Sequence, residues 1–259
     1  MVDVKNIRKS ICQMAKHLYD KNIADSSGGN ISVRDGNLIY ITQRRSGEVY
    51  QWLIEEDSIL VTDICGNPVI GSVENITREA TTHYYIYQNF SDIKAIIHCH
   101  PLYMMVFGAA HMEIPAVSEC TRDHLGDQPI TCTPEVEPGS ENQAIEVVKE
   151  FKKRRAIDPE AGLIVNIPYH GVFIAGRDLN STFIAIEAAE NAAKIIIYRK
   201  LMFHDDPRAD FSIHQKLSRG YLEKLEEQKQ YCKIGQEYSD AFGKKRIYDG
   251  KCPYISKKF

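Results

Sequence analysis

A strand-like run that ends in two histidines constrains this chain more than any other feature. Residues 94–97 read Lys-Ala-Ile-Ile and lead into His98, Cys99 and His100. Because side chains alternate faces along a strand, His98 and His100 point the same way and Cys99 points to the opposite face. Two imidazoles on one rigid edge are half of a divalent-metal site. The rest of the fold has to bring further ligands to this strand end.

Two other segments offer the missing ligands. Glu79 lies at the start of a predicted helix, so its carboxylate is expected in the first turn, and His170 supplies a third imidazole. Imidazole and carboxylate ligands without thiolates favour zinc, with manganese, cobalt or iron as alternatives. His83 lies four residues after Glu79 on the same helical face, and it is either a ligand or a support for one.

Composition excludes several classes of protein. The chain has 259 residues, 43% of them hydrophobic, which is enough for a substantial core. Its net charge of −3 gives no electrostatic argument for nucleic acid binding. No apolar run approaches the roughly 20 residues that span a bilayer, and residues 1–6 lack the apolar core of a signal peptide. Seven cysteines without a Cys-x-x-Cys pair suit a reducing compartment. We therefore expect a soluble, cytoplasmic protein with neither a nucleic acid nor a membrane partner.

Hydrophobic spacing predicts interleaved helices and strands. Helical spacing predicts helices over 4–22, 76–90, 102–110, 142–155 and 182–203. Strand patterns with intervening turns predict strands over 31–33, 38–41, 59–61, 68–70, 94–97, 162–167 and 172–174. Thr77 is the expected N-cap of the second helix, and Ile145, Val148 and Phe151 are expected to share one side of the fourth. Residues 114–137 are expected to form strands and loops. The pattern indicates an α/β or α+β fold, with helices covering a sheet.

The chain changes character after residue 204. All of the predicted strands and the five helices given above precede this point, whereas residues 205–259 carry many lysines and arginines and few aliphatic residues. We expect a domain over residues 1–204 and a C-terminal extension over residues 205–259 that is helical or irregular.

Two short turns and one arginine are suited to binding an anion. The Gly-rich turn over residues 27–30 can present backbone N–H groups and small hydroxyls to a phosphate or carboxylate. The turn over residues 44–47 is cationic, and arginine binds such anions in bidentate fashion. Many Gly-rich turns are only tight turns, and surface arginines are often simply solvated. The candidate binding residues are Ser27, Gly28, Gly29, Asn30, Arg44, Ser46, Gly47 and Arg78.

Three motifs in order resemble those of the class II aldolase and adducin family. Residues 27–34, Ser-Gly-Gly-Asn-Ile-Ser-Val-Arg, resemble its Gly-Asn-(Leu/Val/Ile)-Ser-x-Arg loop. Residues 77–87 and 95–101 together resemble its central signature. Residues 169–176 and the Ala-rich helix that follows resemble its third signature. The resemblance covers about residues 5–204 and leaves the C-terminal extension unmatched.

This resemblance implies both a fold and a site. The implied fold is a three-layer α/β/α sandwich with a central, mainly antiparallel sheet, in a homo-oligomer, usually a tetramer, with active sites at subunit interfaces. His98, His100 and His170 would bind the metal. Glu79 would be both ligand and acid/base. Because epimerases of the family carry aspartate at this position, the glutamate favours carbon–carbon cleavage. The residues implied for phosphate binding are Ser27, Asn30, Ser46, Gly47 and Thr77.

The implied function is a metal-dependent lyase of carbohydrate metabolism, an aldolase that cleaves a small phosphorylated sugar or a related hydroxy-carbonyl compound. The metal would stabilise an enediolate and Glu79 would move a proton. The chain departs from the family pattern in its acid/base residues. Glu135 aligns with the catalytic tyrosine that sugar-phosphate aldolases take from a neighbouring subunit, and Glu119 lies near a catalytic glutamate of a dehydratase member. Thr77 and Arg78 replace two serines of typical aldolases.

Two alternatives stay open at this point. A decarboxylase or dehydratase of a sugar acid or ketose phosphate would use the same enediolate chemistry, with Glu119 or Glu135 as an additional acid/base. A non-catalytic, adducin-like binding module would be expected to have lost its metal ligands. Here Glu79 and all three histidines are present.

Overall fold

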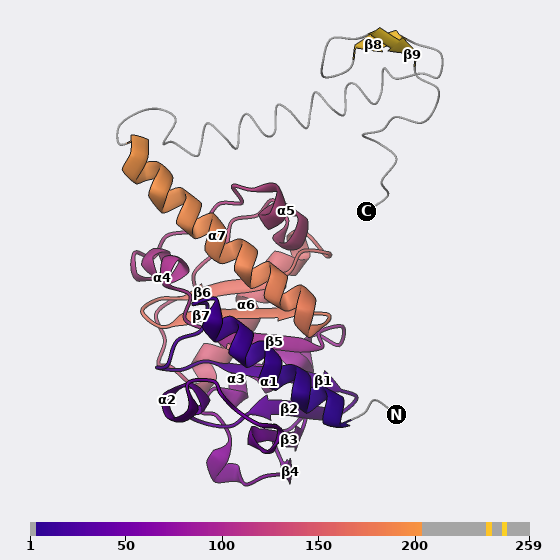
Figure 1. The fold of residues 1–259 in the computed structure, drawn as a ribbon, viewed down its shortest axis with the longest axis vertical. Helices are drawn as coiled ribbons and strands as arrows, with labels where there is room; N and C mark the ends of the chain where they lie inside the picture. Colours follow the sequence, from indigo (N-terminus) through magenta and orange to yellow (C-terminus); the bar gives the residue numbers. More distant parts are fainter. Residues whose placement is uncertain (1–3, 204–236, 240–244, 248–259) are drawn as a thin grey trace. The chain divides into compact units, whose positions relative to one another are not determined.

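A computed structural model describes residues 4–203, 237–239 and 245–247 of the chain (Figure 1). The chain divides into two units, Met1–His204 and Asp205–Phe259, and each is described by itself. In the second unit, β8 (Glu237–Ser239) pairs antiparallel with β9 (Lys245–Ile247). The rest of the expected helical or irregular extension lies outside the described residues.

A seven-stranded sheet organises the first unit. Its strands are β1 (Asn30–Asp35), β2 (Leu38–Thr42), β3 (Ile59–Asp63), β4 (Pro68–Ile70), β5 (Ala95–Cys99), β6 (Leu163–Ile167) and β7 (Gly171–Gly176). Their order is β4-β3-β2-β1-β5-β7-β6, and every neighbouring pair is antiparallel. β5, which carries His98, pairs with β1 on one side and with β7 on the other. The end of this strand therefore lies in the interior of the sheet and not at its edge.

Turn residues explain why these strands pair locally. β1 and β2 are joined at Gly36, whose φ of 58° is a left-handed conformation that suits glycine in a tight turn. β3 and β4 are joined through Gly66, with a φ of 89°, and the Asp63 carboxylate accepts N–H bonds from Cys65 and Asn67. The expected hairpins and the mainly antiparallel sheet are therefore confirmed.

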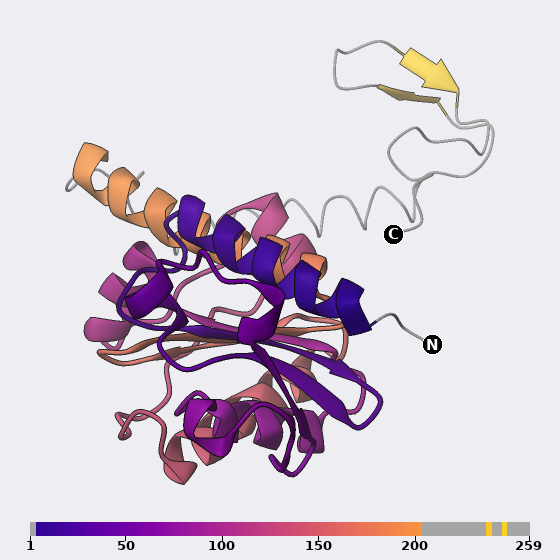
Figure 2. The ribbon, with the colours of Figure 1, turned by 60° about the horizontal axis from the view of Figure 1, so that its bottom comes forward.

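Helices cover both faces of the sheet (Figure 2). One face carries α1 (Val4–Asp20) and α7 (Leu179–Phe203), and the other carries α3 (Ala80–Asn89) and α6 (Glu141–Ile157). The remaining helices are α2 (Ser46–Tyr50), α4 (Leu102–Ala109), α5 (Glu119–Leu125) and the 3-10 turns η1 (Glu56–Ser58) and η2 (Val73–Asn75). This arrangement confirms the expected three-layer α/β/α sandwich. None of the described helices is both long and apolar enough to cross a membrane.

The helices α3 and α6 cover larger core side chains than those that α7 itself contributes. Bulky residues fill the layer under α3 and α6, where Tyr87, Phe151 and Phe173 are fully buried. In contrast, many of the buried side chains of α7 are small, among them Ala185, Ala189 and Ala192. Small residues let a long helix lie close to the strands that it covers, at the cost of less apolar area buried per residue.

Three local expectations were wrong, each for a visible reason. α3 begins at Ala80 with Glu79 as its N-cap residue, so Thr77 does not cap it. The Thr77 hydroxyl instead accepts a hydrogen bond from Asn30, 3.2 Å away. Residues 114–137 contain a helix, α5, that was expected to be absent; the Ser118 hydroxyl caps it by accepting the N–H of Thr121 at 3.1 Å.

The third error concerns the face of α6. Val148 and Phe151 are buried as expected, but Ile145 is 46% exposed. The buried face of α6 includes Ala144 and Val147. The core position in this turn of the helix is therefore Ala144, one residue before Ile145. A small alanine is easily overlooked as a core residue beside a larger isoleucine.

Candidate metal centre

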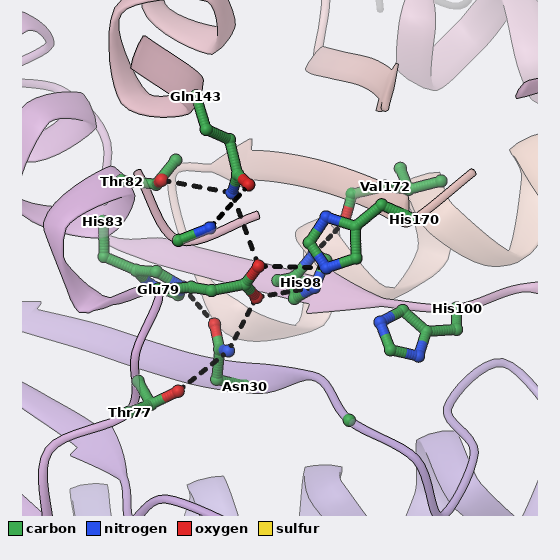
Figure 3. Close-up of polar contacts among 12 residues, drawn as sticks. Asn30, Thr77, Glu79, Thr82, His83, His98, His100, Gln143, His170 and Val172 are labelled. Atoms are coloured by element: carbon green, nitrogen blue, oxygen red, sulfur yellow. Dashed lines mark hydrogen bonds and ion pairs between the residues drawn. The ribbon is translucent and has the colours of Figure 1, made fainter. Parts of the chain in front are cut away.

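Three histidines meet where β5 ends and the β6–β7 turn returns to it (Figure 3). One nitrogen from each of His98, His100 and His170 lies within 4.8 Å of the others. Gly171 makes this approach possible, because a Cβ there would lie only 2.6 Å from both the Cys99 carbonyl oxygen and the His100 ring. The structure thus brings together the three imidazoles that the sequence singled out.

The ring orientations leave nitrogen lone pairs facing the space between the rings. Nδ1 of His98 lies 2.9 Å from the Val172 carbonyl oxygen, so Nδ1–H donates and Nε2 is left without a proton in the neutral ring. Nδ1 of His100 lies 3.1 Å from Oδ1 of Asp25, which leaves Nε2 of His100 in the same state. Both Nε2 atoms are buried, and neither makes a hydrogen bond among the described residues, although Nε2 of His98 lies beside the Glu79 carboxylate. A cation would satisfy these two nitrogens, and Nε2 of His170, which also lies beside Glu79, is the third candidate ligand atom.

Glu79 completes the donor set. Its carboxylate is 4% exposed, with Oε2 2.7 Å from Nε2 of His98 and Oε1 3.0 Å from Nε2 of His170. A neutral His98 would turn a lone pair toward Oε2, so the pair requires a proton or a metal ion between them. Three imidazoles and one carboxylate are a donor set that zinc accepts, and the residues present therefore fit a divalent metal.

An amide group also donates to each oxygen of this carboxylate. Nδ2 of Asn30 donates to Oε2 of Glu79 at 3.2 Å, and Nε2 of Gln143 donates to Oε1 at 3.4 Å. Burial raises the pKa of the Glu79 carboxyl, but the charges and hydrogen bonds of His98 and His170 outweigh it and hold that pKa well below its usual range. Glu79 is therefore held ionised although it is almost completely buried.

His100 is prepared to act as a ligand at neutral pH. Burial, followed by the charge of His98, lowers the pKa of the His100 imidazole to about 4. The ring is therefore neutral at pH 7, as a metal ligand must be. The Asp25 carboxylate also accepts the backbone N–H of Ser27 at 2.9 Å. The loop that contains Asp25 and Ser27 thus fixes the carboxylate that accepts the Nδ1–H of His100.

The two turns that were predicted to bind an anion lie side by side near His100. Gly28 closely approaches the His100 ring, because a Cβ on Gly28 would lie 2.8 Å from Cε1 of that ring. Trp52 ties the two turns together: a Cβ on Gly29 would lie 3.3 Å from its ring, and one on Gly47 would lie 2.9 Å from its Nε1. That indole N–H also donates to the Asp25 carbonyl oxygen at 2.7 Å.

Residues 9–197 match a family described as the class II aldolase and adducin N-terminal domain. The chain belongs to this family. An L-fuculose phosphate aldolase from Methanocaldococcus jannaschii is 31% identical to it over 195 residues, which cover 75% of this chain and 98% of that protein. A probable L-ribulose-5-phosphate 4-epimerase from Mycoplasma pneumoniae is 23% identical over 222 residues, covering 82% and 90%. A solved structure of an L-fuculose 1-phosphate aldolase has a TM-score of 0.66 at 26% identity, covering 76% of this chain and 87% of the other.

These matches confirm the family resemblance that the three motifs predicted. The named relatives of this class II aldolase chain are enzymes, and their names differ in both reaction and sugar. The similarity therefore establishes the class II aldolase scaffold, and it leaves the substrate to be inferred from the site.

The remaining charged residues that were predicted for the class II aldolase site are more exposed, whereas Ser46 is buried. The side chains of Arg44 and Arg78 are both exposed. Arg78 packs across Gly139, where a Cβ would lie 2.7 Å from Cγ of Arg78. Glu119 begins α5 and Glu135 lies in the loop before α6; both are exposed, and within the described residues neither hydrogen bonds to Glu79 or to the three histidines. Their catalytic roles stay predictions.

Sequence reasoning missed two residues that contact the centre. Gln143 is fully buried and lies 64 positions from Glu79, with no motif around it. Its Oε1 accepts the Gly139 N–H at 2.9 Å, which fixes the amide with Nε2 toward the carboxylate. Asp25 was not singled out because it precedes the Gly-rich turn over residues 27–30 and belongs to no motif, although a carboxylate is a common partner of a ligand histidine.

Proposed function

We propose that the protein is a metal-dependent lyase that cleaves a small phosphorylated sugar, or a related hydroxy-carbonyl compound, by retro-aldol chemistry. The observation that carries the proposal is the Glu79 carboxylate, held 2.7 Å from Nε2 of His98 and 3.0 Å from Nε2 of His170, with His100 beside it. A ligand set with an acid/base group in its midst is what such a reaction requires.

The three histidines would hold a divalent ion, with zinc the first choice for this donor set. Such an ion supplies a Lewis acid that stabilises negative charge developing on the substrate oxygens. Glu79, which is ionised, would accept the proton of the substrate hydroxyl as that hydroxyl becomes the aldehyde carbonyl and the carbon–carbon bond breaks. The electron pair of the broken bond would stay on the carbon of the ketose fragment, and Glu79 would return the proton to that carbon.

Residues of the two turns would bind the phosphate of the substrate. Gly-rich turns can direct backbone N–H groups toward an anion. In this chain the hydroxyls of Ser27 and Ser46 now donate to Asp25 and Gln43, and they would turn to the phosphate when it binds. The arginines add positive charge at the entrance, where an anion arrives. The proposed phosphate-binding residues are Ser27, Gly28, Gly29, Asn30, Arg44, Ser46, Gly47, Thr77 and Arg78.

Two lines of support favour aldol cleavage of a phosphorylated ketose. The family resemblance pairs glutamate at position 79 with aldolases and aspartate with epimerases. The relatives are named for a fuculose phosphate and a ribulose phosphate, both phosphorylated ketoses. We further infer a cytoplasmic homotetramer with interfacial sites, in which Glu119 and Glu135 of a neighbouring copy would add acid/base groups to the centre.

The test is a product analysis of the metal-loaded protein with a panel of ketose 1-phosphates and 5-phosphates. Cleavage should release an aldehyde together with a phosphorylated three- or two-carbon fragment, and Glu79→Gln should abolish the release. Glu160→Gln, which changes an exposed carboxylate paired with Arg177, is the matched control and should retain activity. Loss of carbon dioxide or water without a two-fragment split would replace the aldolase proposal with a decarboxylase or dehydratase. No turnover of any compound would overturn both.

A further inference from the structure

A buried chain of hydrogen bonds runs behind Glu79, between β1 and α3 (Figure 3 shows its first part). Asn30 and Ser32 point to the same face of β1 because they are two residues apart. Glu79, His83 and Tyr87 share one face of α3 because they are spaced by four. The five side chains interleave, and each is at most 4% exposed.

When Glu79 is ionised, the donor and the acceptor of every hydrogen bond in this series are determined. Nδ2 of Asn30 donates to Oε2 of Glu79 at 3.2 Å, so Oδ1 of Asn30 faces Nε2 of His83, 2.5 Å away. Oδ1 can only accept, so Nε2 of His83 must carry the ring proton. Nδ1 of the neutral ring must then accept from the Ser32 hydroxyl, 2.6 Å away.

The hydrogen bond between Ser32 and Tyr87, at the other end of the series, is consistent with these donor and acceptor assignments. Having given its proton to His83, the Ser32 hydroxyl is left to accept, and the hydroxyl of Tyr87 lies 2.8 Å from it as the donor. Burial, together with the charge of His98, lowers the pKa of the His83 imidazole to about 3, so the ring is neutral at pH 7. Burial also raises the pKa of the Tyr87 phenol, which keeps its proton available.

We propose that His83 is a positioning residue, which acts by fixing the Asn30 amide with its N–H2 group toward Glu79 and Thr77. This inference deepens the proposed function, because it takes Glu79 as the acid/base of that site. Rotated by half a turn, the amide would place Oδ1 beside Oε2 of Glu79, and two acceptors would face each other in a dry pocket. The Nε2–H of His83 prevents this rotation, since the rotated amide would turn a donor toward it.

The first test reads the His83 ring in the unmodified protein. Nitrogen-15 NMR of histidine-labelled protein distinguishes protonated from unprotonated ring nitrogens, and the signals missing from His83→Gln identify this residue. The structure requires a proton on Nε2 and none on Nδ1 at pH 7. A proton on Nδ1, or on both nitrogens, would overturn the proposal whether or not the variants fold.

The second test measures the affinity for Co²⁺ alone, by competition with a chromophoric chelator, so that it does not depend on turnover. His83→Leu should weaken Co²⁺ binding by about tenfold, as expected when a group that orients a ligand is removed. His83→Gln, whose side-chain N–H2 can replace Nε2–H, should recover most of this loss. In an Asn30→Ala background, His83→Leu should change the affinity by less than about twofold, because the residue through which it acts is gone.

Two results would contradict a positioning role. One is an equal loss on His83→Leu with and without Asn30, and the other is a His83→Gln variant that binds no better than His83→Leu. Failure to cleave any phosphorylated ketose would remove the proposed function alone. The ring protonation and the Co²⁺ affinities would still decide the role of His83.

Discussion

The site has two halves that differ in burial and in how they are held. The histidine half consists of Glu79, His98, His100 and His170, and the loop half consists of the two turns over residues 27–30 and 44–47. Around Glu79 the side chains are buried, and both carboxylate oxygens and Nδ1 of His98 have defined partners, such as Gln143 beside Glu79 and Val172 behind His98. Around the anion-binding turns the arginines are exposed, and the chain is held mainly by backbone geometry and by the buried ring of Trp52. The first half is fixed by strands and helices, and the second by two turns.

This difference separates chemistry from substrate choice. A buried, fully bonded carboxylate tolerates little change, because an unpaired group there costs its full desolvation energy. Exposed side chains on turns can change at small cost in stability. We therefore expect the histidine half to set the reaction and the loop half to set which phosphorylated compound is accepted. The predictions below test this division.

The largest expected effect is on turnover when Glu79 is changed. Glu79→Gln keeps the shape but removes the proton carrier, and kcat should fall by about 10³-fold, as for loss of a general acid or base. Metal content should stay near that of the unmodified protein, because three imidazoles remain. Steady-state kinetics and metal analysis on the same sample separate the two effects. A variant with unchanged kcat would remove Glu79 from the reaction.

A smaller effect, on metal affinity, is expected when Asp25, the hydrogen-bond partner of the ligand His100, is changed. Asp25→Asn keeps an acceptor for His100 but removes its charge, so metal affinity should weaken by about tenfold. Asp63→Asn is the matched control, since Asp63 also accepts N–H bonds within a turn but contacts no histidine of the centre. Equal affinities for the two variants would show that Asp25 does not support His100.

The buried histidines predict how the metal-free protein responds to acid. His83 and His100 have pKa values of about 3 and about 4 when folded, mainly because burial disfavours the charged ring. An unfolded histidine takes up a proton near pH 6.5, so the unfolded state binds more protons below that pH. Stability is therefore fully present above pH 6.5 and is lost as the pH falls toward 4, by up to about 1.4 kcal/mol per pH unit for each histidine.

Urea unfolding of the chelator-treated protein between pH 7 and 4.5 measures this slope. His83→Gln should reduce it by about half, because one of the two contributions is removed. A slope that is unchanged in this variant would mean that His83 is not neutral in the folded protein. Exposed His111 offers the control substitution, His111→Gln, which should leave the slope as it is.

The smallest expected effect belongs to the loop half. Arg44→Ala should raise KM for the phosphorylated substrate by about two- to fivefold and leave kcat nearly unchanged, as for an exposed charge pair. Arg45→Ala is the comparison, because the Arg45 guanidinium is already engaged by Glu48 at 2.7 Å. It should have a weaker effect on KM than Arg44→Ala. A kcat effect as large as that of Glu79→Gln would break the division between the two halves.

The parts that the sequence predicted are those that depend on local periodicity. Strand alternation put His98 and His100 on one face, and the hairpin turns gave the antiparallel sheet. His170 came only from a separate motif, since no local rule says that the β6–β7 turn reaches β5. Gln143 had no signal, because a glutamine on an amphipathic helix looks solvent-facing until its buried partner is known.

Other errors arose where small or polar residues decided the packing. Ile145 was placed in the core because it is large and apolar, whereas Ala144 occupies that position. The role of Trp52 depends on the absence of side chains at Gly29 and Gly47, which the sequence shows only as flexible turns. Long-range contacts and close approaches of this kind become visible only in three dimensions.

Metal analysis after equilibrium dialysis tests the central claim most directly, by comparing the unmodified protein with His98→Ala. If three imidazoles from β5 and the β6–β7 turn bind one ion, the unmodified protein should retain about one equivalent of zinc per chain and the variant should lose nearly all of it. Zinc retained in full by His98→Ala, or absent from the unmodified protein, would contradict the account.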